Sequence, residues 1–273
     1  MDKKSEFIVL ILLLLVVGSI LFLNHKLMLE SQKDRDSFIE ANLANKASLL
    51  EYILKGLSLG VQDLALSSEV TVYFQNVDLQ MSLEYGLAIS IMVVQKKLEK
   101  FQAINVMNGN KLFNCISLVD SSNQIIAYAS VGEHLEHIDL LKQYLNRSHR
   151  DFQNLTAFEH NGELKLVLFQ PVVLKGIYRG GIFGILENKT LLEILTQKSS
   201  GSHIFLVHNS LYYPKLEGEF KNILIGKTRK SPFIVFEKEL SHFPIKMLEL
   251  VDAKALRGGL PPWAITFSLG LLA

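Results

Sequence analysis

The sequence is poor in cysteine, proline and tryptophan, and it carries almost no net charge. Among its 273 residues are one cysteine, six prolines and one tryptophan, and 28 Lys and Arg nearly balance 27 Asp and Glu. The single cysteine, Cys115, excludes a disulfide framework within the chain, and the apolar run around it indicates a small core residue. Because the charges cancel, no net field attracts nucleic acid, and we expect no nucleic-acid partner.

The sequence also lacks the short signatures of common enzymes. No G-x-S-x-G occurs, and the Gly-Lys-Thr at 226–228 has Lys221 where a phosphate-binding loop needs glycine. The densest group of possible metal ligands, EHLEH at 133–137, fits no zinc motif and is typical of a solvated helix start. We therefore expect no catalytic residue, no metal and no cofactor in this chain.

Long uncharged apolar segments stand at both ends of the chain. Residues 7–23 read FIVLILLLLVVGSILFL, and a helix needs about 17 to 20 apolar residues to cross a bilayer. This run predicts a transmembrane helix, with residues 1–6 in the cytoplasm because Lys3 and Lys4 precede it. A cleaved signal peptide is the alternative, although no A-x-A-like site follows the run. Residues 258–273 predict the start of a second transmembrane helix, truncated at the C-terminus.

The segment at 24–104 has helical periodicity. Apolar residues recur there at spacings of three and four: Ile39, Leu43, Ala47, Leu50, Leu54, Leu57, Val61 and Leu64. This stripe predicts a long helix that continues from the membrane segment. It is longer than one small sheet would cover, so we expect a homodimer through this helix. Further helices are expected over 70–76 and 79–104.

After Lys111 the pattern changes to that of antiparallel strands. Two hairpins are predicted, 112–120 with 125–130 and 155–160 with 163–173, the second around the turn signal Asn161-Gly162. Another strand with a glycine-rich turn is expected over 174–187, short helices over 139–146 and 191–197, and strands of a smaller sheet over 203–214, 231–240 and 244–253. The fold class is therefore α+β, with a five-stranded antiparallel sheet followed by a smaller one.

This order of elements resembles the double Cache family, or PDC sensors, the PAS-like extracytoplasmic domains of bacterial receptors. ISLVDSSNQIIAYAS at 116–130 is similar to the strand, turn and strand of the family, and LVLFQPVVLKGIYRGGIFGIL at 166–186 is similar to its later hairpin. The resemblance covers about 26–256. It implies a membrane-distal PAS-like module at 105–198 and a smaller membrane-proximal module at 199–257.

The resemblance also implies a function. The chain would be the periplasmic ligand-sensing region of a receptor in the bacterial inner membrane, which binds a small molecule and signals through membrane helices. The output domain, of the sensor histidine kinase (two-component) or diguanylate cyclase type, would follow residue 273. The alternative is a membrane-anchored assembly or adaptor protein that acts through its long helix. The sequence does not name the ligand.

Candidate ligand-binding residues surround the predicted distal sheet. A small anion or organic acid would use a guanidinium fork and phenolic hydrogen bonds, which these side chains offer: Tyr128, Tyr144, Arg147, Arg150 and Tyr178. Arg150 is the first choice for the charged contact, in a pocket within 112–186, although each of these residues is also typical of an ordinary surface. Amino-acid-binding members of the family carry a Trp-Tyr pair that 143–154 lacks, which argues against an amino-acid ligand.

Overall fold

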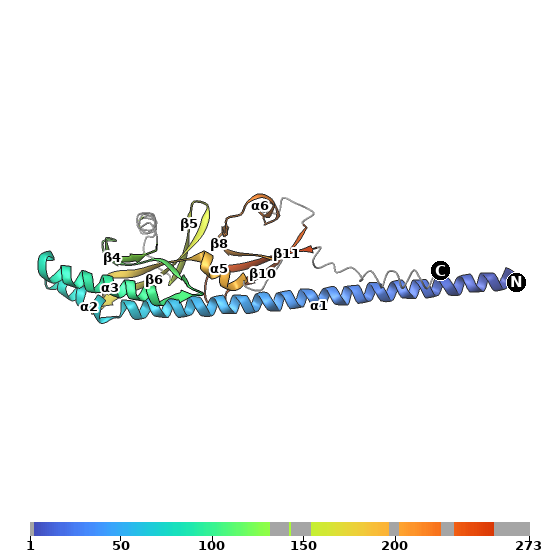
Figure 1. Ribbon diagram of the computed structural model, residues 1–273, viewed down its shortest axis with the longest axis horizontal. Coiled ribbons are helices and arrows are strands. Elements are labelled where there is room, and N and C mark those ends of the chain that lie inside the picture. Colours follow the sequence, from blue (N-terminus) through green and yellow to red (C-terminus); the bar gives the residue numbers. More distant parts are fainter. Residues whose placement is uncertain (1–2, 132–141, 143–153, 197–201, 225–231, 254–273) are drawn as a thin grey trace.

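One helix organises the molecule. The computed structural model describes residues 3–131, 142, 154–196, 202–224 and 232–253, with the side chains of 3–17 and 20 outside this description. Helix α1 (Lys3–Ala65) is 63 residues long, and both sheets lie along its C-terminal half (Figure 1). The long helix predicted after residue 24 is confirmed.

The apolar stripe of α1 is buried within the chain itself. Leu43, Leu50 and Leu54 are at most 2% exposed, and the other residues of the stripe also pack into the main core, which includes residues of both sheets. The predicted helical face is therefore confirmed. The reason given for a homodimer is wrong, because the two sheets and the neighbouring helices together cover what one small sheet would leave open.

Two further helices extend the helical layer at the far end of α1. They are α2 (Ser68–Asp78) and α3 (Ala88–Ile104), with a π-helical turn η1 (Leu83–Leu87) before α3. The helix expected over 79–104 therefore starts late, and Leu83, in the π-helical turn, is 71% exposed. Val94 and Leu98 of α3 are fully buried.

The larger sheet has five antiparallel strands. Their order across the sheet is β4 (Ile125–Ser130), β3 (Phe113–Asp120), β7 (Ile177–Leu186), β6 (Glu163–Leu174) and β5 (Leu155–His160). A two-stranded ribbon, β1 (Val106–Met107) and β2 (Asn110–Lys111), precedes it. Strand β3 pairs with β4, and β5 pairs with β6, so both predicted hairpins are confirmed. In the second hairpin, Asn161 and Gly162 have φ of 52° and 78°, as its tight turn requires.

The glycines of β7 correct one expectation. Only Gly176 lies in a turn, whereas Gly180, Gly181 and Gly184 lie inside the strand. A Cβ at Gly181 would stand 2.2 Å from a ring carbon of Phe169. Glycine is needed there for close approach of a neighbouring side chain, and the strand is not interrupted.

The smaller sheet has four antiparallel strands. Their order is β10 (Phe233–Glu239), β11 (Lys246–Asp252), β8 (Ser202–His208) and β9 (Leu211–Tyr213). Helix α5 (Asn188–Thr196) connects the two sheets, and α6 (Gly218–Leu224) packs on the face away from α1. The strand expected over 203–214 is in fact a hairpin, and α6 was not predicted.

The predicted membrane segments lie largely outside the described side chains. Across the described residues, no helix is long and apolar enough to cross a membrane. The run at 7–23 belongs to α1, but its side chains up to residue 17 and at 20 are not described, and 258–273 is not described at all. The helix predicted at 139–146 is also outside the description, except for residue 142.

Candidate functional site

The outer face of the five-stranded sheet, turned away from α1, is the candidate site. Strand register aligns Tyr128, Ser117, Phe183 and Phe169 in one row across four strands. Around this row lies the outer cluster, which consists of Cys115, Val119, Phe158, Val167, Phe169, Phe183 and Ile185, with Ile125 and Tyr128 packed against it. The floor of the candidate site is therefore mainly aromatic and aliphatic.

Ser117 is the polar exception in the middle of this row. Its side chain is fully buried, and its Oγ has no hydrogen-bond partner among the described residues. A buried hydroxyl without a partner is costly, so such a group is often kept for a ligand or an ordered water. Burial also raises the pKa of the neighbouring Cys115 thiol to about 12, which keeps it protonated and unreactive.

Helix α3 fixes the edge strand β4 at the same row. The Gln95 side-chain oxygen accepts a hydrogen bond from the Tyr128 backbone N–H at 3.0 Å, and its Nε2 donates to the Tyr128 carbonyl. One amide therefore replaces the missing strand neighbour of β4 at this position. These two hydrogen bonds hold Tyr128 in place beside Ser117 and the aromatic floor.

The predicted ligand residues are only partly brought together. Tyr128 packs against the outer cluster. Tyr178, at the start of β7, is not part of this cluster and lies near Asp120, at the end of β3. Burial, and then the Asp120 carboxylate, raises the pKa of the Tyr178 phenol. Tyr144, Arg147 and Arg150 lie outside the described residues, so their role stays a prediction.

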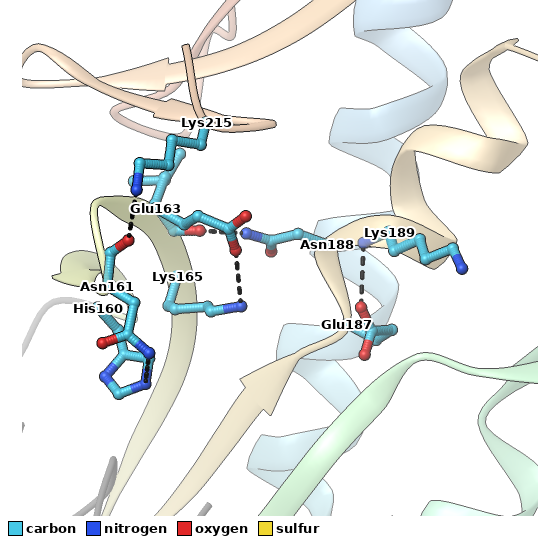
Figure 2. Close-up of polar contacts among 9 residues, drawn as sticks. His160, Asn161, Glu163, Lys165, Glu187, Asn188, Lys189 and Lys215 are labelled. Atoms are coloured by element: carbon cyan, nitrogen blue, oxygen red, sulfur yellow. Dashed lines mark hydrogen bonds and ion pairs between the residues drawn. The ribbon is translucent and has the colours of Figure 1, made fainter. Parts of the chain in front are cut away.

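One polar contact joins the two modules, and a second one fastens α5 to the larger sheet. Figure 2 shows Lys215, from the smaller sheet's side, donating to the Asn161 carbonyl at 3.3 Å, and the Asn188 amide reaching the backbone of β6. That second bond, from Asn188 Nδ2 to the Leu164 carbonyl, is 2.6 Å long and buried. The hairpin β5–β6 is thereby fastened both to α5 and to the module of the smaller sheet.

Charged contacts tie α1 to the smaller sheet. Lys46 Nζ lies 2.7 Å from Glu249 Oε1, and these side chains are only 11% and 3% exposed. Glu51 accepts hydrogen bonds from the backbone N–H and from Nδ1 of His242, in the turn between β10 and β11. The His242 side-chain bond is the main reason why the pKa of Glu51 lies below its usual value. The helix and the last strand are thus joined through polar groups.

Sequence reasoning missed Ser117, Gln95 and the Lys46–Glu249 pair. Ser117 was visible as a lone hydroxyl within the apolar run FNCISLVD. The pair has no such signal, because its members are 203 residues apart and meet only when the sheet packs on the helix.

Comparison with known proteins bears on the fold. At the level of sequence, the chain matches no protein-family profile and no curated protein. The extracellular domain of vpHK1S-Z8, described as a histidine kinase, matches at TM-score 0.55 and 11% identity over 83% of this chain and 94% of that chain. A domain of a Vibrio parahaemolyticus protein, described as of the sensory box/GGDEF family, matches at TM-score 0.54 and 12% identity over 83% and 99%.

A third similar structure contains a ligand. It is the ligand-binding domain of the Pseudomonas fluorescens chemoreceptor CtaA in complex with L-serine, at TM-score 0.50 and 15% identity over 81% of this chain and 99% of that chain. Likeness at these identities establishes the fold alone. The chain has the Cache-like fold of the extracellular sensor domains of histidine kinases and chemoreceptors.

Proposed function

We propose that this chain is the extracytoplasmic ligand-sensing region of a bacterial transmembrane signalling receptor. The observation that carries the proposal is the fold match, over 83% of this chain and 94% of that chain, to a histidine-kinase extracellular domain. The signal would pass through α1 and the segment after β11 to a cytoplasmic output domain of the histidine kinase or diguanylate cyclase type. The sensing region itself would bind and transmit, without catalysis.

The ligand is proposed to be a small molecule held on the outer face of the distal sheet. Ser117 and Tyr128 would supply hydrogen bonds from the floor, and Arg150, with Arg147 and Tyr144, a charged or phenolic contact from 132–153. Ligands that bind only the folded state raise its stability by mass action. Thermal unfolding of the full chain against panels of organic acids, amines and amino acids tests this. A shift that saturates and disappears in Ser117→Val and Arg150→Ala supports the site, and a saturating shift that survives both variants contradicts it.

The membrane topology is a second part of the proposal. Residues 7–23 and 258–273 would lie in the inner membrane, with both modules in the periplasm. Alkaline phosphatase inserted at Gly162, in an exposed hairpin turn of the described sheet, should be active because it folds only outside the cytoplasm. Activity of a cytoplasmic reporter at Gly162, and none of the phosphatase, would reject this topology.

A homodimer remains part of the proposal, through the face of α1 opposite the buried stripe. Four large side chains there are exposed by 42–77%: Phe38, Leu49, Tyr52 and Leu59. A parallel copy would cover them. In a Cys115→Ser background, cysteines at Phe38 and Tyr52 should cross-link between copies, and cysteines at Leu43 and Leu50 should not. Equal cross-linking at all four positions, or none, would contradict this face.

One observation favours the second candidate function, an assembly or adaptor protein. The segment around η1 exposes five large apolar side chains by 43–76%: Leu79, Met81, Leu83, Tyr85 and Ile89. Exposed apolar patches of this kind often mark protein partners. An adaptor predicts that Leu83→Ser with Tyr85→Ser shrinks the assembly that contains the full chain on native gels of solubilised membranes. A receptor predicts an unchanged assembly and an unchanged ligand response.

A further inference from the structure

A cavity of about 750 Å³ lies on the outer face of the smaller sheet, apart from the distal site. Its floor includes Val207, Leu248 and Val235, which lie on three neighbouring strands, and Ile223 and Leu224 of α6 cover part of it. Small-molecule sites have volumes of about 300–1,000 Å³ and mostly apolar walls with a few polar groups. The cavity therefore has the size of a binding site, and its wall combines apolar side chains with charged and polar ones.

One end of this cavity carries an excess of negative charge. Lys246, in the floor, lies 3.3 Å from Glu237 Oε2 and 3.3 Å from Glu239 Oε1. The hydrogen bonds that Lys246 donates to the two carboxylates raise its pKa above the usual value, and the bond to Glu237 has the larger effect. The ammonium of Lys246 therefore stays charged. Two carboxylates and one ammonium leave one negative charge. The second oxygen of each carboxylate has no partner among the described residues.

The other end of the cavity is apolar and aromatic. Tyr212 is paired with Val207 in the β8–β9 ladder, is half-buried, and makes no hydrogen bond with the described part of the chain. Leu248 and the end of α6 continue this apolar surface. A phenol ring beside aliphatic side chains suits the flat or aliphatic body of a ligand, and its face also attracts a cation.

We infer that this cavity binds an organic cation with an apolar body, such as an arylalkylammonium or alkylammonium ion. Its ammonium would bind the free oxygens of Glu237 and Glu239 and complete the charge balance beside Lys246. Its body would lie over Leu248 and Val207, against Tyr212. A metal ion fits less well, since no group of three or more His, Cys, Asp or Glu side chains that could hold one occurs within the described residues. The inference concerns a site in the other module and does not depend on the distal ligand proposed above.

Three probes of nearly equal shape test the charge requirement: benzylammonium, benzyl alcohol and benzoate. Each is titrated against the full chain in a neutral detergent by calorimetry, and hydrogen–deuterium exchange with the saturated complex locates the site. Benzylammonium should bind at least about tenfold tighter than the alcohol, since about 1.4 kcal/mol corresponds to a factor of ten. It should protect 204–212 and 235–248. Equal binding of benzyl alcohol, no binding of benzylammonium, or protection elsewhere would overturn the inference.

Variants separate this site from the distal one. Glu237→Gln with Glu239→Gln should weaken benzylammonium at least about tenfold, whereas Glu159→Gln, an exposed carboxyl on β5, should leave it unchanged. Val235→Trp, which fills the cavity from the sheet, should abolish binding without removing any charge. Unchanged binding in a folded variant of either kind would overturn the inference. Protection of 113–186 instead would also overturn it, while leaving the proposed receptor function intact.

Discussion

The two sheets are joined to the same helix by different kinds of contact. Leu54 and Val61 of α1 belong to the apolar core that also contains Leu166 and Ile182 of the five-stranded sheet. The four-stranded sheet adds to its own apolar contacts a buried ion pair, Lys46–Glu249, and the Glu51–His242 hydrogen bonds.

This difference has consequences for how each module responds to its surroundings. Apolar packing is insensitive to pH and to modest changes of salt, and close-packed interiors move as units. Charged contacts depend on protonation and on geometry, and a buried pair fails as a whole when one member is removed. We therefore expect the distal module and α1 to behave as one body, and the proximal module to be the part whose attachment can be altered.

The largest effect is expected from breaking the buried pair. Glu249→Ala leaves the Lys46 ammonium buried without its partner and should lower the free energy of unfolding by about 3–5 kcal/mol. Lys46→Met with Glu249→Leu removes both charges and should recover most of that loss. Urea unfolding of the full chain in neutral detergent measures both. A cost below about 1 kcal/mol for the single variant would mean that charge does not hold the proximal module.

A smaller effect of opposite sign is expected in the distal module. Ser117→Ala removes a buried hydroxyl that lacks a partner, and should stabilise the ligand-free protein by about 1 kcal/mol. Ser90 is the matched control, because its buried hydroxyl accepts from Asn76 at 2.6 Å and donates to the Gly86 carbonyl at 3.0 Å. Ser90→Ala should therefore destabilise by about 0.5–1.5 kcal/mol. Equal losses for both serines would show that Ser117 is not a spare polar group.

The smallest effect concerns pH at the proximal attachment. The pKa of Glu51 is lowered from 4.5, so its contribution is present above that value and is lost as pH falls through the lowered pKa of the folded state. Because the His242 side chain is largely exposed, this contact contributes about 0.2–1 kcal/mol to the free energy of unfolding. In Glu51→Gln, the free energy of unfolding should fall less on acidification than in the unaltered chain, by this amount. In the control Glu84→Gln, at an exposed carboxyl, it should fall as much as in the unaltered chain. Urea midpoints measured from pH 7 down to pH 3 decide, and identical pH profiles for Glu51→Gln and the unaltered chain would contradict the attachment.

Local signals in the sequence predicted most elements of the fold. The spacing of Leu43, Leu50 and Leu54 specifies a helical face, and Asn161-Gly162 specifies a hairpin, because both depend only on residues close in the chain. The π-turn before α3 and the continuation of β7 through its glycines were not predictable in this way. They depend on Met81 against Gly86 and on Phe169 against Gly181, which are contacts made by packing.

The candidate site was less predictable than the fold. Tyr128 was a candidate because of its type and its place at the predicted sheet, and its role stays a prediction. Its neighbour Ser117 was not a candidate, because a serine inside an apolar run has no pattern that marks it as unpartnered. The burial of the helical stripe was expected, but not what covers it. Whether an apolar face meets its own sheet or another copy is decided by how many elements fold back onto it, which periodicity does not record.

The position of Glu249 has a mechanical consequence. Strand β11 is held by ladders to β10 on one side and β8 on the other, and Lys46 fastens the same strand to α1. A force along β11 would act in shear on its hydrogen bonds to β10 and β8 and on the ion pair. These bonds would resist the force together and would not break one after another. Figure 1 shows β11 lying alongside α1. Strand β11 and the first helix would thus share a load applied at the chain beyond Asp252 for as long as the Lys46–Glu249 pair stays intact.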